Sequence, residues 1–433
     1  MSSEVTWPCL TLQQAGVGLI DCDHRTPPAA SEGVPYIAIP QLKDGHLDLN
    51  GVRRIAPADY VEWTKKLKPR VNDVIVVRRC NSGDSALVPP GLECAIGQNL
   101  VVLRSTGAAI EPKFLRWLVR GPEWWGQVAK FINVGAVFDS LRCRDIPYFE
   151  LTVPPLADQR EIAGLLNALD DRIALLRETN TTLEAISQAL FKSWFVDFDP
   201  VRAKQRGLAP AGMDEATAAL FPDSFEESAL GLVPIGWRVG TLGDVSLNPR
   251  LGAKPENIPP ETPYFGLEHM PRRSIALANA GTAEGLESGK FWFERDDVLF
   301  GKLRPYFHKV GLAPTRGVCS TDILVVRPNG PSLLGFIAMH ASSDALIAHT
   351  TMLSNGARMP RTSWQDIADF KVVLPPQEVA AAFNGVAYAL FERIFTNIDA
   401  ARALSETRDT LLPRLISGQL RLPEAQAQIE VEG

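Results

Sequence analysis

Two stretches of this sequence come close to a catalytic motif, and both are incomplete. A methyltransferase would need Asn or Asp followed directly by two prolines and an aromatic ring. Residues 257–261 read Asn-Ile-Pro-Pro-Glu, so the motif is interrupted and lacks the ring, and we interpret it as a proline-rich turn. A phosphate-binding loop would need two glycines before Lys-Ser/Thr, but Gly289-Lys290 is followed by Phe291 and lacks the first glycine.

The sequence also lacks a complete motif for a nuclease or for a metal site. Acid-x-Lys pairs occur at Asp369-Phe370-Lys371 and Glu111-Pro112-Lys113, each without a convincing second acid. The six cysteines form no C-x-x-C pair, and neither they nor the six histidines show the spacing of a zinc site. We therefore expect reduced thiols, no catalytic residues, no metal and no cofactor in this chain.

The remaining chemistry is recognition by basic side chains. The net charge of −6 argues against nucleic-acid binding when taken alone. However, residues 51–80 hold eight basic residues against three acidic ones, and residues 295–316 hold five against two. No run of 18 apolar residues and no signal-peptide pattern occurs, so we expect a cytoplasmic protein without a membrane partner.

The elements that position these residues occur twice. Short sequence pairs return at one offset of 221 residues, and upstream pairs return at slightly larger offsets. The constant pairs are Gly135-Ala136 with Gly356-Ala357, Asp145-Ile146 with Asp366-Ile367, and Pro154-Pro155 with Pro375-Pro376. The upstream pairs are Pro35-Tyr36 with Pro263-Tyr264, Asp73-Val74 with Asp297-Val298, and Trp7 with Trp237. The chain is therefore a duplicated unit, a turn-rich part followed by a helical part.

Seam residues alternate at spacings of four and three over residues 158–195, which is typical of a coiled coil, and a second copy with a corresponding apolar seam runs over 378–416. The first run of 38 residues would be about 57 Å long, too long for a helix lying on one small core. The predicted seam contains Ile162, Leu166, Leu169, Ile173, Leu176, Asn180, Leu183, Leu190, Phe383, Val386, Leu390, Ile394, Leu404 and Leu411. We expect antiparallel packing, with Asn180 fixing the register.

The fold class is therefore α+β, with two mixed α/β domains separated by a long antiparallel two-helix coiled coil, in a pseudo-two-fold internal repeat. Residues 71–77 and 298–300 are predicted strands. Residues 114–130 are a predicted helix with Trp117, Trp124 and Trp125 in a core. The expected boundaries are 1–153 and 235–374 for the two domains, 154–198 and 375–420 for the helices, 199–234 for a linker, and 421–433 for a tail.

Several segments together resemble the specificity subunit of type I restriction–modification systems. They are 154–163 (PPLADQREIA), 190–198 (LFKSWFVDF), 220–222 with 231–237, and 407–418 (TRDTLLPRLISG). The resemblance covers nearly the whole chain. One departure is that Asp158-Gln159-Arg160 has no counterpart in the second copy at 377–381, so we expect contacts made there in the first copy to be missing in the second and the two partner-docking surfaces to differ.

The resemblance implies a division of labour. Each domain would be a target-recognition domain that reads one half of a bipartite, asymmetric double-stranded DNA target. The helices would set the spacer and dock two copies of a DNA methyltransferase subunit, which supplies the S-adenosylmethionine site and adenine methylation. A motor-nuclease subunit would join for restriction, and this chain would be non-catalytic.

DNA reading requires side chains that reach base edges and phosphates. In the first domain the candidates are Arg78, Arg79, Asn81 and Ser82, with Tyr36, Lys65, Lys66 and Lys68. In the second they are Lys302, Arg304 and Tyr306, with Tyr264, Arg272, Arg273, Lys309, Arg358 and Arg361.

Two other hypotheses remain open: a degenerate nuclease or methyltransferase, and a decoy that binds the methyltransferase without reading DNA. The acidic total charge is the best support for the decoy.

Overall fold

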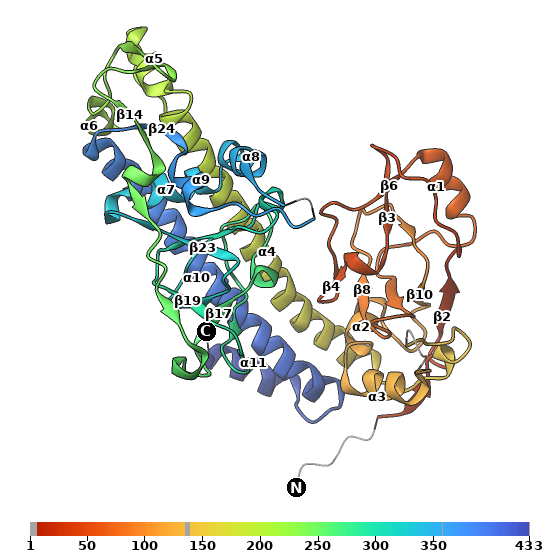
Figure 1. Cartoon of the computed structure of the whole chain (residues 1–433). Coiled ribbons are helices and arrows are strands. Elements are labelled where there is room, and N and C mark those ends of the chain that lie inside the picture. Colours follow the sequence, from red (N-terminus) through yellow and green to blue (C-terminus); the bar gives the residue numbers. More distant parts are fainter. Residues whose placement is uncertain (1–6, 135–138, 357, 433) are drawn as a thin grey trace. The chain divides into compact units, whose positions relative to one another are not determined.

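The computed structural model describes residues 7–134, 139–356 and 358–432, and divides into two units (Figure 1). Unit 1 combines Met1–Arg172 with Ala403–Gly433, and unit 2 is Ile173–Arg402. Each unit therefore contains one turn-rich part of the repeat together with part of both long helices. Gly135, Ala136 and Ala357 of the sequence repeat lie outside the described residues.

Unit 1 is built around a four-stranded antiparallel sheet of order β2-β10-β7-β8. Its central strand β7 consists of four consecutive buried aliphatic residues, as expected for a strand covered on both faces. The strands of this sheet are β2 (Val17–Asp21), β7 (Val74–Val77), β8 (Ser85–Leu87) and β10 (Leu100–Ser105). Smaller sheets join β3 (Val34–Ile37) to β6 (Arg54–Ile55) and β9 (Ala95–Ile96), β4 (Leu42–Lys43) to β5 (His46–Leu47), and β1 (Cys9–Thr11) to β11 (Glu150–Thr152).

Unit 2 repeats this topology in a four-stranded sheet of order β15-β23-β20-β21. Its strands are β15 (Ser246–Leu247), β20 (Val298–Gly301), β21 (Val310–Leu312) and β23 (Ile323–Pro328). A second sheet of order β16-β19-β22-β17-β18 contains β16 (Gly252–Ala253), β17 (Pro263–Phe265), β18 (Gly281–Thr282), β19 (Lys290–Phe293) and β22 (Gly317–Cys319). The pair β14 (Arg238–Thr241) with β24 (Lys371–Leu374) corresponds to β1 with β11.

Strand registers place equivalent residues at the same positions in both units. Val74 pairs with Leu103 in unit 1, and Val298 pairs with Val326 in unit 2. The parallel pairs are also equivalent, since Tyr36 lies opposite Ala95 and Tyr264 lies opposite Val318. The duplication inferred from the sequence is therefore present in the backbone.

Two helices replace the single helix expected over 114–130. Helices α2 (Pro112–Leu118) and α3 (Pro122–Phe131) are separated at Gly121-Pro122, because proline disfavours the helical conformation in the residue before it. Trp117 and Trp124 are fully buried as expected, whereas Trp125 is exposed. Unit 2 has the same arrangement in α7 (Leu334–Ala341) and α8 (Asp344–Leu353).

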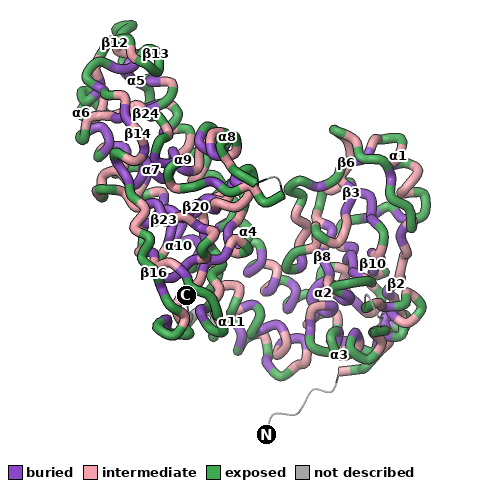
Figure 2. The backbone as a smooth tube through the Cα atoms, in the orientation of Figure 1, coloured by how far each residue is buried: buried purple, intermediate pink, exposed green. Residues whose placement is uncertain are grey.

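The long helices α4 (Leu156–Phe195) and α10 (Gln377–Ile416) each contain 40 residues. In unit 1 the beginning of α4 shares a core with the end of α10, through Leu166 and Leu411. In unit 2 the end of α4 shares a core with the beginning of α10, through Phe191 and Phe383. The helices are therefore antiparallel, and buried residues recur along both (Figures 1 and 2).

The seam of α4 buries its predicted residues from Ile162 to Asn180, while Leu183 and Leu190 are half-buried. The prediction was wrong for α10 at Val386, whose side chain is 45% exposed. Ala387 and Phe391 are buried instead, because this face of α10 also packs on α7. The glycine at position 335 permits that approach, since a Cβ there would lie 2.8 Å from the Cβ of Ala387. Leu390 and Leu404 are half-buried, and Phe383, Ile394 and Leu411 are buried.

A buried pair of amides joins the helices within unit 2. Asn397 donates from Nδ2 to Oδ1 of Asn180 at 2.8 Å, and Asn180 donates to the carbonyl of Ile394 at 3.2 Å. Both side chains are buried. Since a buried amide without a partner costs free energy, this pair stabilises one particular register of the two helices.

The segment expected as a linker, 199–234, has regular structure and packs within unit 2. It contains α5 (Asp199–Gln205), α6 (Glu215–Ala219) and the hairpin of β12 (Phe225–Ser228) and β13 (Gly231–Pro234). Val201 and Phe221 are buried in the core of unit 2. The other helices are α1 (Pro57–Trp63), α9 (Trp364–Ala368) and α11 (Leu422–Glu432). Among the described residues, no helix is both long and apolar enough to span a membrane.

Candidate nucleic-acid interface

In unit 1 two loops are joined directly after strand β7. Arg79 forms a β-bridge with Ser140, which itself bridges to Asn133. Backbone hydrogen bonds complete the junction, from the Leu141 N–H to the Arg78 carbonyl at 2.8 Å and from the Cys80 N–H to the Asp139 carbonyl at 3.2 Å. We call this arrangement the paired loop: residues 78–80, 133 and 139–141.

Unit 2 has the same paired loop after strand β20, formed by residues 302–304, 355 and 360–362. Leu303 bridges to Arg361, and Arg361 bridges to Asn355. The Thr362 N–H donates to the Lys302 carbonyl at 3.0 Å, and the Arg304 N–H donates to the Pro360 carbonyl at 2.8 Å. Every backbone contact of the first paired loop therefore has a counterpart in the second.

Both paired loops contain a strained residue at the same place. Cys80 has φ 67° and Arg304 has φ 52°, in the left-handed region that favours glycine. Such a conformation costs on the order of 1–3 kcal/mol and is retained where the surroundings impose it, often at functional sites. Here the backbone bonds to Asp139 and to Pro360 impose it.

A buried ion pair braces the far end of each central strand. Arg104 on β10 binds both oxygens of Asp73 at 2.7 and 2.6 Å, and Arg327 on β23 binds Asp297 at the same two distances. Both aspartates are buried. Bidentate pairs of this kind fix strand geometry, so each paired loop extends from a rigid strand.

The candidates of the first domain divide into accessible and inaccessible side chains. Lys65, Lys66, Lys68, Arg79 and Asn81 are exposed, and Arg78 is half-buried. Lys65 and Lys68 are paired with Glu62 and Glu93, respectively. They follow α1, whereas Arg78 and Arg79 belong to the paired loop.

Tyr36 and Ser82 are buried and cannot contact DNA in this conformation. The side chain of Tyr36 is 3% exposed, and its hydroxyl donates to the carbonyl of Arg25 at 3.3 Å. Ser82 is 6% exposed and donates to the carbonyl of Arg78 at 2.9 Å. Tyr36 packs with Ile55 and Tyr60 in a small core, which accounts for its place in a strand.

The candidates of the second domain are more accessible. Arg272, Arg273, Tyr306, Arg358 and Arg361 are exposed, whereas Tyr264, Lys302, Arg304 and Lys309 are half-buried. The structure brings Lys302, Arg304, Arg358 and Arg361 together at the paired loop, where Arg304 donates to the Arg358 carbonyl at 3.3 Å.

Polar contacts within the unit also occupy Arg273, Arg361 and Lys309. Arg273 pairs with Asp344 at 3.0 Å, and Arg361 pairs with Asp322 at 3.1 Å. The Nζ of Lys309 donates to the Leu267 carbonyl, and burial lowers the pKa of Lys309. Lys309 is therefore a poor candidate for a phosphate contact.

The sequence analysis missed Asn133 and Asn355, which close the two paired loops. A signal was present, since they are separated by 222 residues, close to the offset of the repeat. Asn is unremarkable in a turn-rich region, and only the bridges to Ser140 and Arg361 show that the two positions are equivalent.

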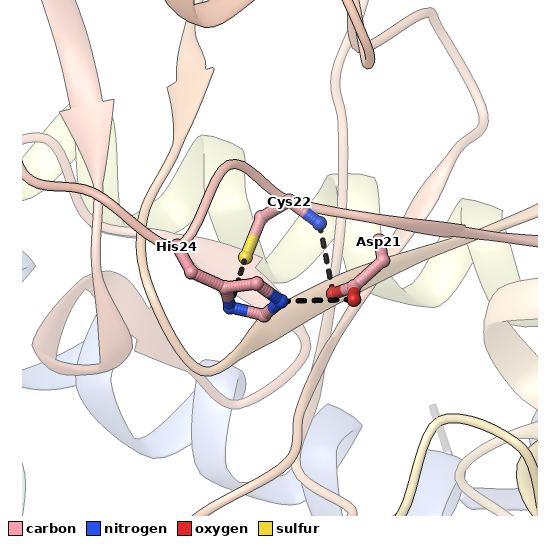
Figure 3. Close-up of side chains that lie close together, drawn as sticks. All are labelled: Asp21, Cys22 and His24. Carbon is pink, nitrogen blue, oxygen red and sulfur yellow. Dashed lines mark hydrogen bonds and ion pairs between the residues drawn. The ribbon is translucent and has the colours of Figure 1, made fainter.

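One cluster of metal-ligand types occurs in unit 1, at Asp21, Cys22 and His24 (Figure 3). The Nε2 atom of His24 lies 3.0 Å from Asp21 Oδ2, and its Nδ1 atom lies 3.8 Å from Cys22 Sγ. Because the ring faces its two partners with different nitrogens, one ion could not replace both contacts without reorienting it. Burial, with the neighbouring Asp21 carboxylate, raises the pKa of the Cys22 thiol, so the geometry is that of a hydrogen-bonded chain rather than a thiolate site.

Glu111, from one of the two acid-x-Lys pairs, has structural partners. Glu111 accepts from Arg160 at 3.1 Å, and its N–H donates to Gln159. Gln159 is fully buried and also donates to the carbonyls of Ala109 and Pro154. Gln159 therefore ties the start of α4 to its own unit, and it is not free to dock a partner.

In unit 1 a buried carboxylate joins the turn-rich part to both long helices. Asp170 of α4 accepts from Arg116 of α2 and Arg408 of α10, and lies 2.9 Å from His46. Burial alone would raise the pKa of Asp170, but the His46 contact and the two guanidinium groups outweigh it, so the pKa lies well below its ordinary value. At 221 residues from Asp170, unit 2 has the buried Phe391, so its attachment is apolar.

Comparison with known proteins finds that this chain is similar to one family of proteins. The model of the type I restriction modification DNA specificity domain matches residues 23–185. The specificity subunit of the type I restriction enzyme HindI from Haemophilus influenzae is 22% identical over 373 residues, 75% of this chain and 81% of that protein. The MjaIX specificity subunit from Methanocaldococcus jannaschii is 24% identical over 379 residues, 86% of this chain and 83% of that protein.

A solved structure shows a similar fold over almost the whole chain. The S subunit of the type I restriction–modification system of M. genitalium covers 96% of this chain with 97% of its own, at 14% identity and a TM-score of 0.53. Together these matches confirm the resemblance expected from the sequence.

Proposed function

We propose that the chain is a specificity subunit of a type I restriction–modification system, the family that it resembles, and that it reads a bipartite DNA target. Each paired loop reads one half-site. The observation that carries this proposal is the repetition of one backbone junction with different side chains: Arg79, Cys80 and Ser140 in unit 1 correspond to Leu303, Arg304 and Arg361 in unit 2. Because base edges are read by side chains, the two half-sites differ and the target is asymmetric.

The proposed assembly follows the family. Two copies of a DNA methyltransferase subunit bind the helices, supply the S-adenosylmethionine site and methylate adenine, and a motor-nuclease subunit joins for restriction. The chain itself contributes recognition and no catalytic step. In support, Glu111 pairs with Arg160, and Lys371 lies in strand β24 opposite Thr241.

The experiment is co-expression of the full chain with the methyltransferase subunit of its own system, followed by mapping of methylated adenines. We expect a two-part asymmetric motif with a fixed gap. A gel shift of the same complex with mixed DNA tests the decoy alternative, which predicts binding without sequence preference or no binding at all.

The helices are proposed to set the gap between the half-sites. Half-sites one DNA turn apart lie roughly 34–36 Å from each other, and a 40-residue helix is about 60 Å long. One heptad inserted in each helix, on the same side of the Asn180–Asn397 pair, should lengthen the preferred gap. Selection from random spacers that returns the original gap would refute this part of the proposal.

A further inference from the structure

The two paired loops differ at nearly every position but share one exposed side chain. Arg78, Arg79, Cys80 and Ser140 correspond to Lys302, Leu303, Arg304 and Arg361, whereas Asn133 corresponds to Asn355. Both asparagines are exposed. An identical side chain within an otherwise divergent element requires a reason that both units share.

The backbone does not supply that reason. Asparagine is often needed where φ is positive, yet neither Asn133 nor Asn355 is among the residues with positive φ. Their hydrogen bonds to Ser140 and Arg361 use the main-chain N–H and C=O, which every residue except proline offers.

The side-chain amides are also largely free. Asn133 donates from Nδ2 to the Ser140 carbonyl at 3.4 Å, a long contact that leaves Oδ1 unused. The amide of Asn355 has no hydrogen-bond partner among the described residues. A free carboxamide presents one acceptor beside one donor, the pattern that matches the N6 and N7 atoms of adenine in the major groove.

The surroundings suit a DNA contact at this place. Asn133 is joined through Ser140 to the exposed Arg79, and Asn355 is joined to Arg361, with Arg358 nearby in sequence. Within the described part of the chain, Arg79 and Arg358 have no ion-pair partner. Arginines at such positions can bind phosphates while the amide reaches a base.

We propose that Asn133 and Asn355 each read an adenine, one in each half-site, and that the divergent neighbours read the bases that distinguish the half-sites. This inference rests on the proposed function. It predicts that the asymmetric target contains an adenine at corresponding positions of its two halves.

The test uses the full chain in complex with its methyltransferase subunit, S-adenosylmethionine, and duplex libraries randomised at one half-site at a time. Asn133→Ala should reduce discrimination at a single adenine of one half-site by roughly 5- to 150-fold, the range for a bidentate base contact. Asn355→Ala should do the same in the other half-site. Asn133→Asp should shift preference at that position toward cytosine, whose exocyclic amine donates to a carboxylate.

Asn329→Ala is the matched control. Asn329 is also an exposed asparagine, but it follows the C-terminal end of β23. The second paired loop lies at the other end of that strand, where Gly301 pairs with Ile323. The control variant should leave the motif unchanged. Equal loss of methylation on all sequences in Asn133→Ala would show a docking or folding role and overturn the inference, as would an unchanged motif. A wild-type complex without any two-part motif would instead refute the proposed function itself.

Discussion

Replacing Asp170 by Asn should destabilise unit 1 selectively. The substitution keeps the shape of the side chain but removes the negative charge that faces Arg116 and Arg408, whose side chains are 7% and 6% exposed. Breaking a buried ion pair costs about 3–5 kcal/mol, because the remaining charge has no partner.

The contacts that Arg116 and Arg408 keep place the free-energy cost of Asp170→Asn at the lower end of this range. Arg408 keeps a contact of 2.8 Å to Asp409, which is solvent-accessible, and Arg116 keeps its place over the Trp117 ring at 4.5 Å. We therefore expect a loss of about 3 kcal/mol, equivalent to roughly 150-fold faster hydrogen exchange.

Hydrogen exchange of the full chain, followed by mass spectrometry, measures this loss separately in each unit. Peptides from α2 and from 403–416 should exchange faster in Asp170→Asn, and peptides from α7 should not change. A triple variant with Asp170→Leu, Arg116→Met and Arg408→Leu should recover most of the lost stability, since well-packed apolar groups often replace buried ions. A loss below about 1 kcal/mol in Asp170→Asn would refute the reasoning.

Three further outcomes follow from buried polar groups. Asn180→Leu or Asn397→Leu alone should cost about 1–3 kcal/mol in unit 2 because the remaining buried amide loses the hydrogen bond that joins the two side chains. The double variant should cost less than the sum of the two, as a double-mutant cycle of unfolding in urea will show. Burial lowers the pKa of His340 to about 3, so unit 2 should lose stability as pH falls below about 6.5, the ordinary pKa of histidine. His340→Phe should reduce this acid sensitivity in melting curves of the full chain, and a smaller part should remain because burial also lowers the pKa of His308. Asp170 has a depressed pKa, so its contribution to the stability of unit 1 should be complete above about pH 3.9 and decline only below it. Asp170→Asn should abolish this decline in acid titrations followed by hydrogen exchange.

The long helices could be predicted closely from the sequence because their apolar spacing is a property of local geometry. The predicted starts at 158 and 378 lie within two residues of Leu156 and Gln377. Val386 was predicted wrongly because its larger apolar side chain was preferred to Ala387, whereas the offset of 221 from Leu166 leads to Ala387, which is buried where α10 also packs on α7. Sequence spacing alone carries no information about that second neighbour.

The candidate interface was only partly predictable. Basic residues after a strand pointed to Arg79 and Arg304, but burial depends on tertiary packing, so the buried positions of Tyr36 and Ser82 could not be read from residue type. Asn133 could not be identified because its partner, Ser140, is defined by a bridge between loops rather than by a motif.

The Asn180–Asn397 contact also bears on how new DNA spacers could arise during evolution. Sliding one helix past the other by a turn would leave two amides facing hydrocarbon, so drift by small slips is penalised. If the helices set the gap, only a few discrete spacer lengths are compatible with paired amides. Each new spacer length then requires matched insertions in the two stretches of the gene that encode the helices. The spacer length should therefore change more slowly in evolution than the bases that are read.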